Sequence, residues 1–304
     1  MPKPEISLKN PHDSFFKKLF DNEENVRDFL EAYLPKQLSS NIDFNSVKIT
    51  DTEKENKKHK KYYLDLSVEC NIGKTPSKVY IVFEHKSYYD KLTLMQILNY
   101  CLTIWESEIE NKQEFLTPII PFVFYHGKQK SKLKHNFHEY FEANEALDGY
   151  LMDFKFVIFN TNEIENNDII KKINNLYLSA SLLLMKNIFK DVQELKPILK
   201  EIITLEDDRV IRLFEYIVVN NDIQEEEFIE MVKDIKGDDK MSSLAQRWLD
   251  EGYKDGVQSG IQQGVFETAI IMIKDFQLAI DDVAQKLNIK KEELLDYMQN
   301  KKGE

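Results

Sequence analysis

The chain has 304 residues, of which 42% are hydrophobic and 31% charged, and its formal net charge is −12. This composition excludes a long disordered chain, because 19 Phe and 14 Tyr can build a core. The N-terminus has no apolar run like that of a signal peptide, and no stretch reaches about 18 apolar residues. We therefore expect a cytoplasmic protein with no membrane span, in which Cys70 and Cys101 form no disulfide framework.

The acidic excess lies in the second half of the chain. Residues 1–140 carry 21 Lys and Arg against 20 Asp and Glu, whereas residues 141–304 carry 20 against 33. The total charge argues against nucleic-acid binding, but the nearly neutral first part removes that objection. Only four basic residues are Arg, so we do not expect guanidinium groups to read bases.

Two amphipathic helices are predicted at the start, in PHDSFFKKLFDN and in VRDFLEAYLP, where Pro35 ends the second. Asp13 is the expected N-cap of the first helix. The alternative is that His12 and Asp13 contact a DNA phosphate or an active site. We interpret Glu24 and Glu31 as solvated acids, with a role as an extra active-site acid as the alternative.

A strand-rich block with one helix follows these two helices. Alternating or continuous apolar runs predict the strands, and the Gly/Pro segment NIGKTPS predicts a hairpin between the second and third. The order of elements predicts an α/β fold, a mixed sheet flanked by helices. The expected strands are 46–50, 62–70, 78–86, 118–127 and 153–161, the helix is 92–109, and the charged segment 51–61 is a solvated loop.

Helical spacing dominates the rest of the chain. The predicted helices are 168–190, 194–204, 207–220 and 223–235, then a loop at 236–240 and two short helices at 281–287 and 290–300. We expect a core of residues 1–165, a helical region of residues 166–240 that packs on it, and a C-terminal unit of residues 241–304. The last two helices resemble part of a helix-turn-helix, but their acidic residues favour a small packing unit over a phosphate binder.

Glycines recur at every fourth position at the start of the C-terminal unit, as Gly252, Gly256, Gly260 and Gly264. Each glycine inside a helix costs about 1 kcal/mol relative to alanine. Close packing against another helix, within the chain or in a homo-oligomer, would offset that cost. A flexible linker is the alternative.

The candidate site consists of Asp65, Glu84 and Lys86, supported by Gln96. Asp65 lies in the apolar run YYLDLSV, and Glu84 and Lys86 end the next predicted strand, IVFEHK. Residues i and i+2 point to the same face of a strand, so Glu84 and Lys86 share a face and His85 points away. A hairpin between the two strands would bring Asp65 beside Glu84.

This group of side chains suits phosphodiester hydrolysis. The carboxylates of Asp65 and Glu84 can hold Mg²⁺ or Mn²⁺, which prefer oxygen ligands. Lys86 could orient the attacking water or neutralise developing charge, and Gln96, in the following helix, could hydrogen-bond water or phosphate. A salt bridge between Lys86 and an acid at the strand end is the structural alternative.

Lysine-rich segments flank these strands at 53–60 and 128–135. They are either phosphate contacts at the mouth of the site or solvated loops. Tyr125, His126 and Gly127 end a buried strand, where His126 either touches substrate or makes a structural hydrogen bond. His85 is interpreted as structural.

Four stretches together resemble a known family: PHDSFFKKLFDNEENVRDFLEAYLP, LDLSVE, VYIVFEHKSYYDKLTLMQILNY and PIIPFVFYHG. They are similar to the recombination-promoting nucleases, a transposase-like family of the PD-(D/E)XK nuclease superfamily. The resemblance implies a restriction-endonuclease-like core and Mg²⁺-dependent DNA cleavage. It matches Asp65 and Glu84 to the two motif acids, Lys86 to the motif lysine and Gln96 to a following glutamine. One departure is Leu64, where the superfamily name has proline.

The leading hypothesis is therefore a metal-dependent DNA endonuclease with little sequence preference. A catalytically silent, self-associating protein that binds DNA is the main alternative. A third hypothesis is a nuclease restrained by its own acidic C-terminal residues 241–304.

Overall fold

The computed structural model divides the chain into two compact units, Leu8–Gly237 and a second that includes Asp238–Glu304. Each unit is described by itself. The residues that the structure describes are 11–50, 53–55, 61–73, 77–88, 90, 92–142, 147, 149–151, 153–202, 205–221, 223, 225–236, 247, 265–273, 278–287 and 289–300.

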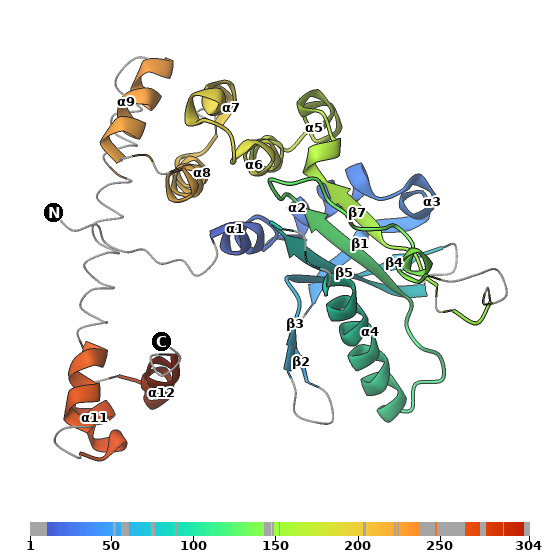
Figure 1. The fold of residues 1–304 in the computed structure, drawn as a ribbon, viewed down its shortest axis with the longest axis horizontal. Helices are drawn as coiled ribbons and strands as arrows, with labels where there is room; N and C mark the ends of the chain where they lie inside the picture. Colours follow the sequence, from blue (N-terminus) through green and yellow to red (C-terminus); the bar gives the residue numbers. More distant parts are fainter. Residues whose placement is uncertain are drawn as a thin grey trace. The chain divides into compact units, whose positions relative to one another are not determined.

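The first unit begins with helices, continues through a sheet and ends with helices (Figure 1). Its α-helices are α1 (Pro11–Leu19), α2 (Glu23–Tyr33), α3 (Lys36–Ser39), α4 (Thr93–Glu110), α5 (Asn166–Lys172), α6 (Leu176–Asn187), α7 (Lys196–Ile202), α8 (Asp207–Asn220) and α9 (Glu225–Lys236). Its strands are β1 (Ile42–Thr50), β2 (Glu53–Glu55), β3 (Lys61–Tyr63), β4 (Leu66–Ile72), β5 (Ser77–Lys86), β6 (Ile119–Tyr125) and β7 (Val157–Asn160), and short 3₁₀ helices are Phe137–Tyr140, Thr161–Glu163 and Val192–Leu195.

The main sheet has the strand order β1-β4-β5-β6-β7. Strand β4 is antiparallel to both β1 and β5, whereas β5, β6 and β7 run parallel to one another. Helix α4 supplies the crossover that a parallel β5–β6 pair requires. The predicted mixed sheet flanked by helices, followed by a helical C-terminal region, is confirmed.

Helices α1 and α2 cover one face of the sheet with aromatic side chains. Phe29 of α2 contacts Phe83 of β5 and Phe122 of β6, with ring centroids 6.4 and 5.7 Å apart. Phe16 of α1 stacks on His85 of β5 at 4.6 Å. Because alternate residues of a strand share a face, the side chains of Phe83 and His85 both point toward α1 and α2.

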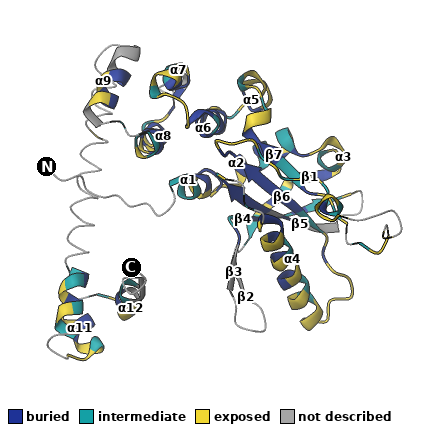
Figure 2. Cartoon of the chain, viewed as in Figure 1, coloured by how far each residue is buried: buried dark blue, intermediate teal, exposed yellow. Residues whose placement is uncertain are grey.

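Helix α4 covers the opposite face. Its buried residues Ile97, Tyr100 and Ile104 pack with Val123 of β6 and with Leu64, which precedes β4. The central strands are buried on both sides, while the outer side of α4 is exposed (Figure 2). The end of β5 therefore lies between two helical layers, where water has little access to polar side chains.

Five predicted boundaries were wrong. The strand predicted at 46–50 begins earlier, at Ile42. Segment 51–61 is not only loop, because Glu53–Glu55 pair with Lys61–Tyr63 as a short antiparallel hairpin. The predicted strand 62–70 is broken at Leu64 and Asp65, for a reason given below. The predicted helix 168–190 is two helices, since Asn175 caps α6 by accepting from the Leu178 backbone N–H. Only Val157–Asn160 of the predicted strand 153–161 is extended in the sheet.

The second unit is helical where it is described. Residues 265–273 form a helix, followed by α11 (Ile280–Lys286) and α12 (Lys291–Asn300). Phe266, Ala269, Val283, Ala284 and Leu294 form its small core. This packing fits the predicted packing unit, whereas the four-residue glycine repeat lies outside the described residues.

Among the described residues, no helix is long and apolar enough to cross a membrane. Cys70 and Cys101 are both buried and free of disulfide bonds.

The aromatic layer allows a test of the core. Phe29 is fully buried, so Phe29→Ala should lower the free energy of unfolding by about 3–5 kcal/mol. Phe115 is 76% exposed, so Phe115→Ala should change it by less than about 0.5 kcal/mol. Urea unfolding followed by circular dichroism measures both values. Equal losses in the two variants would contradict the assignment of the core.

Candidate active site

The two predicted acids meet where the β4–β5 ladder stops. Leu66 pairs with Phe83, and continuing this antiparallel register by one residue places Asp65 opposite Glu84. The ladder ends there because the His85 backbone N–H donates to Asp65 Oδ2, at 2.8 Å, instead of to a strand carbonyl. Asp65 therefore lies in a break between two strands, and not within one strand as predicted.

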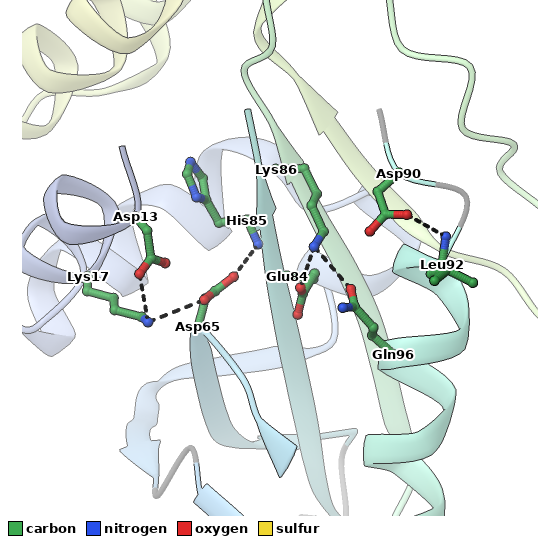
Figure 3. A network of polar contacts seen from close by, with 9 residues as sticks. All are labelled: Asp13, Lys17, Asp65, Glu84, His85, Lys86, Asp90, Leu92 and Gln96. Atoms are coloured by element: carbon green, nitrogen blue, oxygen red, sulfur yellow. Dashed lines mark hydrogen bonds and ion pairs between the residues drawn. The ribbon is translucent and has the colours of Figure 1, made fainter. Parts of the chain in front are cut away.

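Glu84 and Lys86 share one face of β5, as predicted, and α4 covers that face. Lys86 Nζ is 2.9 Å from Glu84 Oε1 and donates to Gln96 Oε1 of α4 at 3.0 Å. Glu84 and Lys86 are only 8% and 9% exposed. The structure thus brings Gln96 to the lysine and holds the ammonium between two oxygen atoms (Figure 3).

The acids are in an environment that disfavours their charge. Burial, and then the nearby Glu84 carboxylate, raise the pKa of Asp65 to about 7. Burial also raises the pKa of Glu84, although Lys86 opposes this effect. Burial would lower the pKa of Lys86, but the Glu84 carboxylate reverses this and keeps the ammonium charged. The site therefore holds more negative charge than Lys86 alone balances.

Helix α1 adds two residues that the sequence analysis did not assign to the site. Lys17 Nζ lies 3.0 Å from Asp13 Oδ2 and 3.5 Å from Asp65 Oδ1 (Figure 3). Asp13 lies at the start of α1 as expected, but it is within the first turn and is not the N-cap; its partner Lys17 links it to Asp65. The i, i+4 spacing of Asp13 and Lys17 was the available signal.

A buried histidine cluster lies on the other side of β5. His85 Nε2 is 2.9 Å from His126 Nδ1, and the two rings stack with centroids 4.7 Å apart. His12 packs edge-on to His126 at 4.8 Å, and its Nδ1 is 2.9 Å from the Tyr216 hydroxyl. Burial lowers the pKa of His85 to about 3 and that of His126 well below its usual value, so both are neutral near pH 7.

The other predicted site residues lie apart from this centre. Glu24 and Glu31 are exposed on α2, as expected of solvated acids. In the segment 128–135, the lysines are exposed and Leu133 is half-buried. Much of the segment 53–60 lies outside the described residues.

The donor set fits a hard divalent cation. Asp65 and Glu84 offer carboxylate oxygens, which Mg²⁺ and Mn²⁺ prefer, and burial, the main cause of each raised pKa, disfavours a carboxylate charge that a bound cation would stabilise. A second group of potential ligands joins Asp65 to Asp13 and His85, with one donor atom of each within 4.8 Å of the others.

Comparison with known proteins identifies the family. Residues 10–212 match the family model described as "Putative transposase, YhgA-like". The chain belongs to this family. The matched region includes α1 and the three residues Asp65, Glu84 and Lys86. The family predicted from the sequence is confirmed.

The chain is similar to several curated proteins of Escherichia coli. It is 28% identical to recombination-promoting nuclease RpnD of strain O157:H7 over 125 residues, which span 41% of this chain and 48% of that protein. It is 23% identical to the inactive recombination-promoting nuclease-like protein RpnE of strain K12 over 278 residues, or 89% of this chain and 92% of that protein. The chain thus covers about half of RpnD. No solved structure matches significantly.

The raised pKa of Asp65 predicts a stability difference that depends on pH. Between about pH 4 and pH 7 the folded protein retains a proton that the unfolded chain has lost, so ionisation opposes folding as the pH rises. In metal-free buffer, the Asp65→Asn variant should gain about 2–4 kcal/mol relative to the original protein across this range. Urea unfolding at several pH values measures the difference, and a constant difference would contradict the shifted pKa.

Proposed function

We propose that this protein is a metal-dependent endonuclease that hydrolyses DNA phosphodiester bonds, with Asp65 and Glu84 as metal ligands. The observation that carries the proposal is the convergence of a buried acid, Glu84, and a half-buried one, Asp65, with Lys86 and Gln96 at the adjoining ends of β4, β5 and α4. Membership in a family whose relatives include proteins named recombination-promoting nucleases supports this chemistry.

A divalent ion held by the two carboxylates would polarise the scissile phosphate and acidify an attacking water. The protein's own residues supply the rest. Lys86 is held by Glu84 and Gln96, so its ammonium is pre-positioned to stabilise negative charge that develops on the phosphate. The backbone N–H of His85 fixes Asp65 Oδ2, which leaves the other oxygen of Asp65 toward Lys17.

The proposed contacts to DNA are made mainly by lysines. Lys128, Lys130, Lys132 and Lys134 are exposed in the segment that follows β6. Ammonium groups bind phosphate as point charges and carry little sequence information. Cleavage with little sequence preference is therefore the expected behaviour, in the context of recombination or of mobile elements.

A catalytically silent, DNA-associated protein is the second candidate. The match that spans most of the chain is to a protein named as inactive. Against it, all four proposed site residues are present: Lys86 bonds to Glu84 and Gln96, and the His85 backbone N–H holds Asp65 opposite Glu84. Self-association through the C-terminal helices stays a prediction, since the glycine repeat is outside the described residues.

Substitution of the acids tests the proposed activity. With Mg²⁺ or Mn²⁺, the purified protein should nick supercoiled plasmid DNA, and Asp65→Asn or Glu84→Gln should reduce the rate by at least about a hundredfold. The loss follows because each change removes a carboxylate from the metal. Lys86→Gln should reduce the rate as well, without abolishing metal binding.

Glu31→Gln is the matched control, because this acid is exposed on α2 and makes the same change of charge. It should leave the rate within about twofold. Undiminished cleavage by Asp65→Asn would overturn the site assignment. DNA binding without cleavage, under every divalent metal tried, would establish the silent alternative instead.

A further inference from the structure

A second group of metal-binding side chains lies beside the proposed catalytic acids, on the side of α1. Donor atoms of Asp13, Asp65 and His85 all lie within 4.8 Å of one another. We propose that these three residues form a second cation site, called here the histidine-side site, which takes a divalent transition-metal ion such as Zn²⁺. It shares Asp65 with the proposed catalytic pair, but it uses neither Glu84 nor Lys86.

A positive charge already occupies the acidic half of this group. The ammonium of Lys17 lies 3.0 Å from Asp13 Oδ2 and 3.5 Å from Asp65 Oδ1, so both carboxylates are oriented toward one cation (Figure 3). The Lys17 side chain is 48% exposed and can move into water. An ion pair whose ammonium is reached by water is weak, so a metal ion can displace Lys17.

His85 supplies the donor that makes the site selective. Its ring is 94% buried, and Phe16 and His126 hold it on two sides. Nε2 is engaged by His126, and no hydrogen bond to a described residue engages Nδ1. The nitrogen left for a metal is therefore Nδ1, and the contact of Nε2 with His126 Nδ1 fixes the orientation of the ring.

The chemistry of the donors separates the two sites. The Asp65–Glu84 pair offers only oxygen, which suits Mg²⁺, whereas an imidazole nitrogen favours Zn²⁺ and related ions over Mg²⁺. Zinc–ligand bonds of about 2.0–2.1 Å put two tetrahedral ligands about 3.4 Å apart, so the group must contract by about 1.5 Å at most. Asp13 is 29% exposed, and its rotation after Lys17 leaves provides that contraction.

Zinc titration in excess Mg²⁺ tests the site, because Mg²⁺ fills the all-oxygen pair. Calorimetry should show that Asp13→Asn weakens Zn²⁺ binding by at least about tenfold. Lys17→Gln should tighten it by about two- to fivefold, because the competing ammonium is gone. Asp21→Asn, the same change at an exposed position just after α1, is the matched control and should have no effect.

A second readout covers the case in which a variant fails to fold. Long-range proton–nitrogen correlation spectra resolve the ring nitrogens of the six histidines, and Zn²⁺ should shift Nδ1 of His85 toward the metal-bound range. An unchanged His85 signal at saturating Zn²⁺ would overturn the proposal. Unaltered affinity in a folded Asp13→Asn, or weaker binding in Lys17→Gln, would do so too.

These measurements are separable from the nuclease proposal because they report binding and not cleavage. Gln96→Ala should slow cleavage while leaving Zn²⁺ affinity at the histidine-side site within about twofold, because Gln96 is uncharged and bonds to Lys86, which is not one of the three proposed ligands. A protein that binds Zn²⁺ in this way but cuts no DNA supports the second site and defeats the proposed activity. A protein that cuts DNA but does not bind Zn²⁺ in this way supports the proposed activity and defeats the second site.

Discussion

The placement of two carboxylates against each other, Glu84 buried and Asp65 half-buried, constrains everything around them. Asp65 and Glu84 would face each other in an unbroken β4–β5 ladder, and burial and mutual repulsion raise the pKa of Asp65 to about 7. Removing two carboxylate charges from water costs free energy unless nearby cations balance their charge. The structure supplies Lys86 from β5 and Lys17 from α1, one for each acid. Gln96 of α4 holds Lys86 in place, whereas Lys17 reaches Asp65 from the partly exposed side of α1.

The same constraint explains why one strand ends where it does. The β4 ladder is interrupted at Asp65, where a side-chain carboxylate takes the His85 N–H that a backbone carbonyl would otherwise accept. His85 in turn is fixed by aromatic stacking with Phe16 and His126. His85 thus joins the polar centre to the aromatic core. Its backbone N–H donates to Asp65, and its ring packs against Phe16 and His126.

Much of this arrangement could be predicted from the sequence, because it depends on periodicity. The two-residue alternation places Glu84 and Lys86 on one face, and the Gly/Pro turn predicts the hairpin that brings Asp65 near. The parts that were missed depend on contacts between distant segments. Asp13 is 52 residues before Asp65, and no local pattern reveals that α1 packs over the end of β5. The break at Leu64 was missed because its apolar neighbours suit a strand.

Burial disfavours the charged forms of Asp65 and Glu84, and a cation bound by both carboxylates would stabilise those forms. Crystals soaked in Mn²⁺ and measured at a wavelength sensitive to manganese would test this claim directly. We predict an anomalous peak within bonding distance of both carboxylates, with Lys86 retained beside it. The account would be contradicted by no peak at saturating Mn²⁺, with the Glu84–Lys86 and Asp65–Lys17 ion pairs intact.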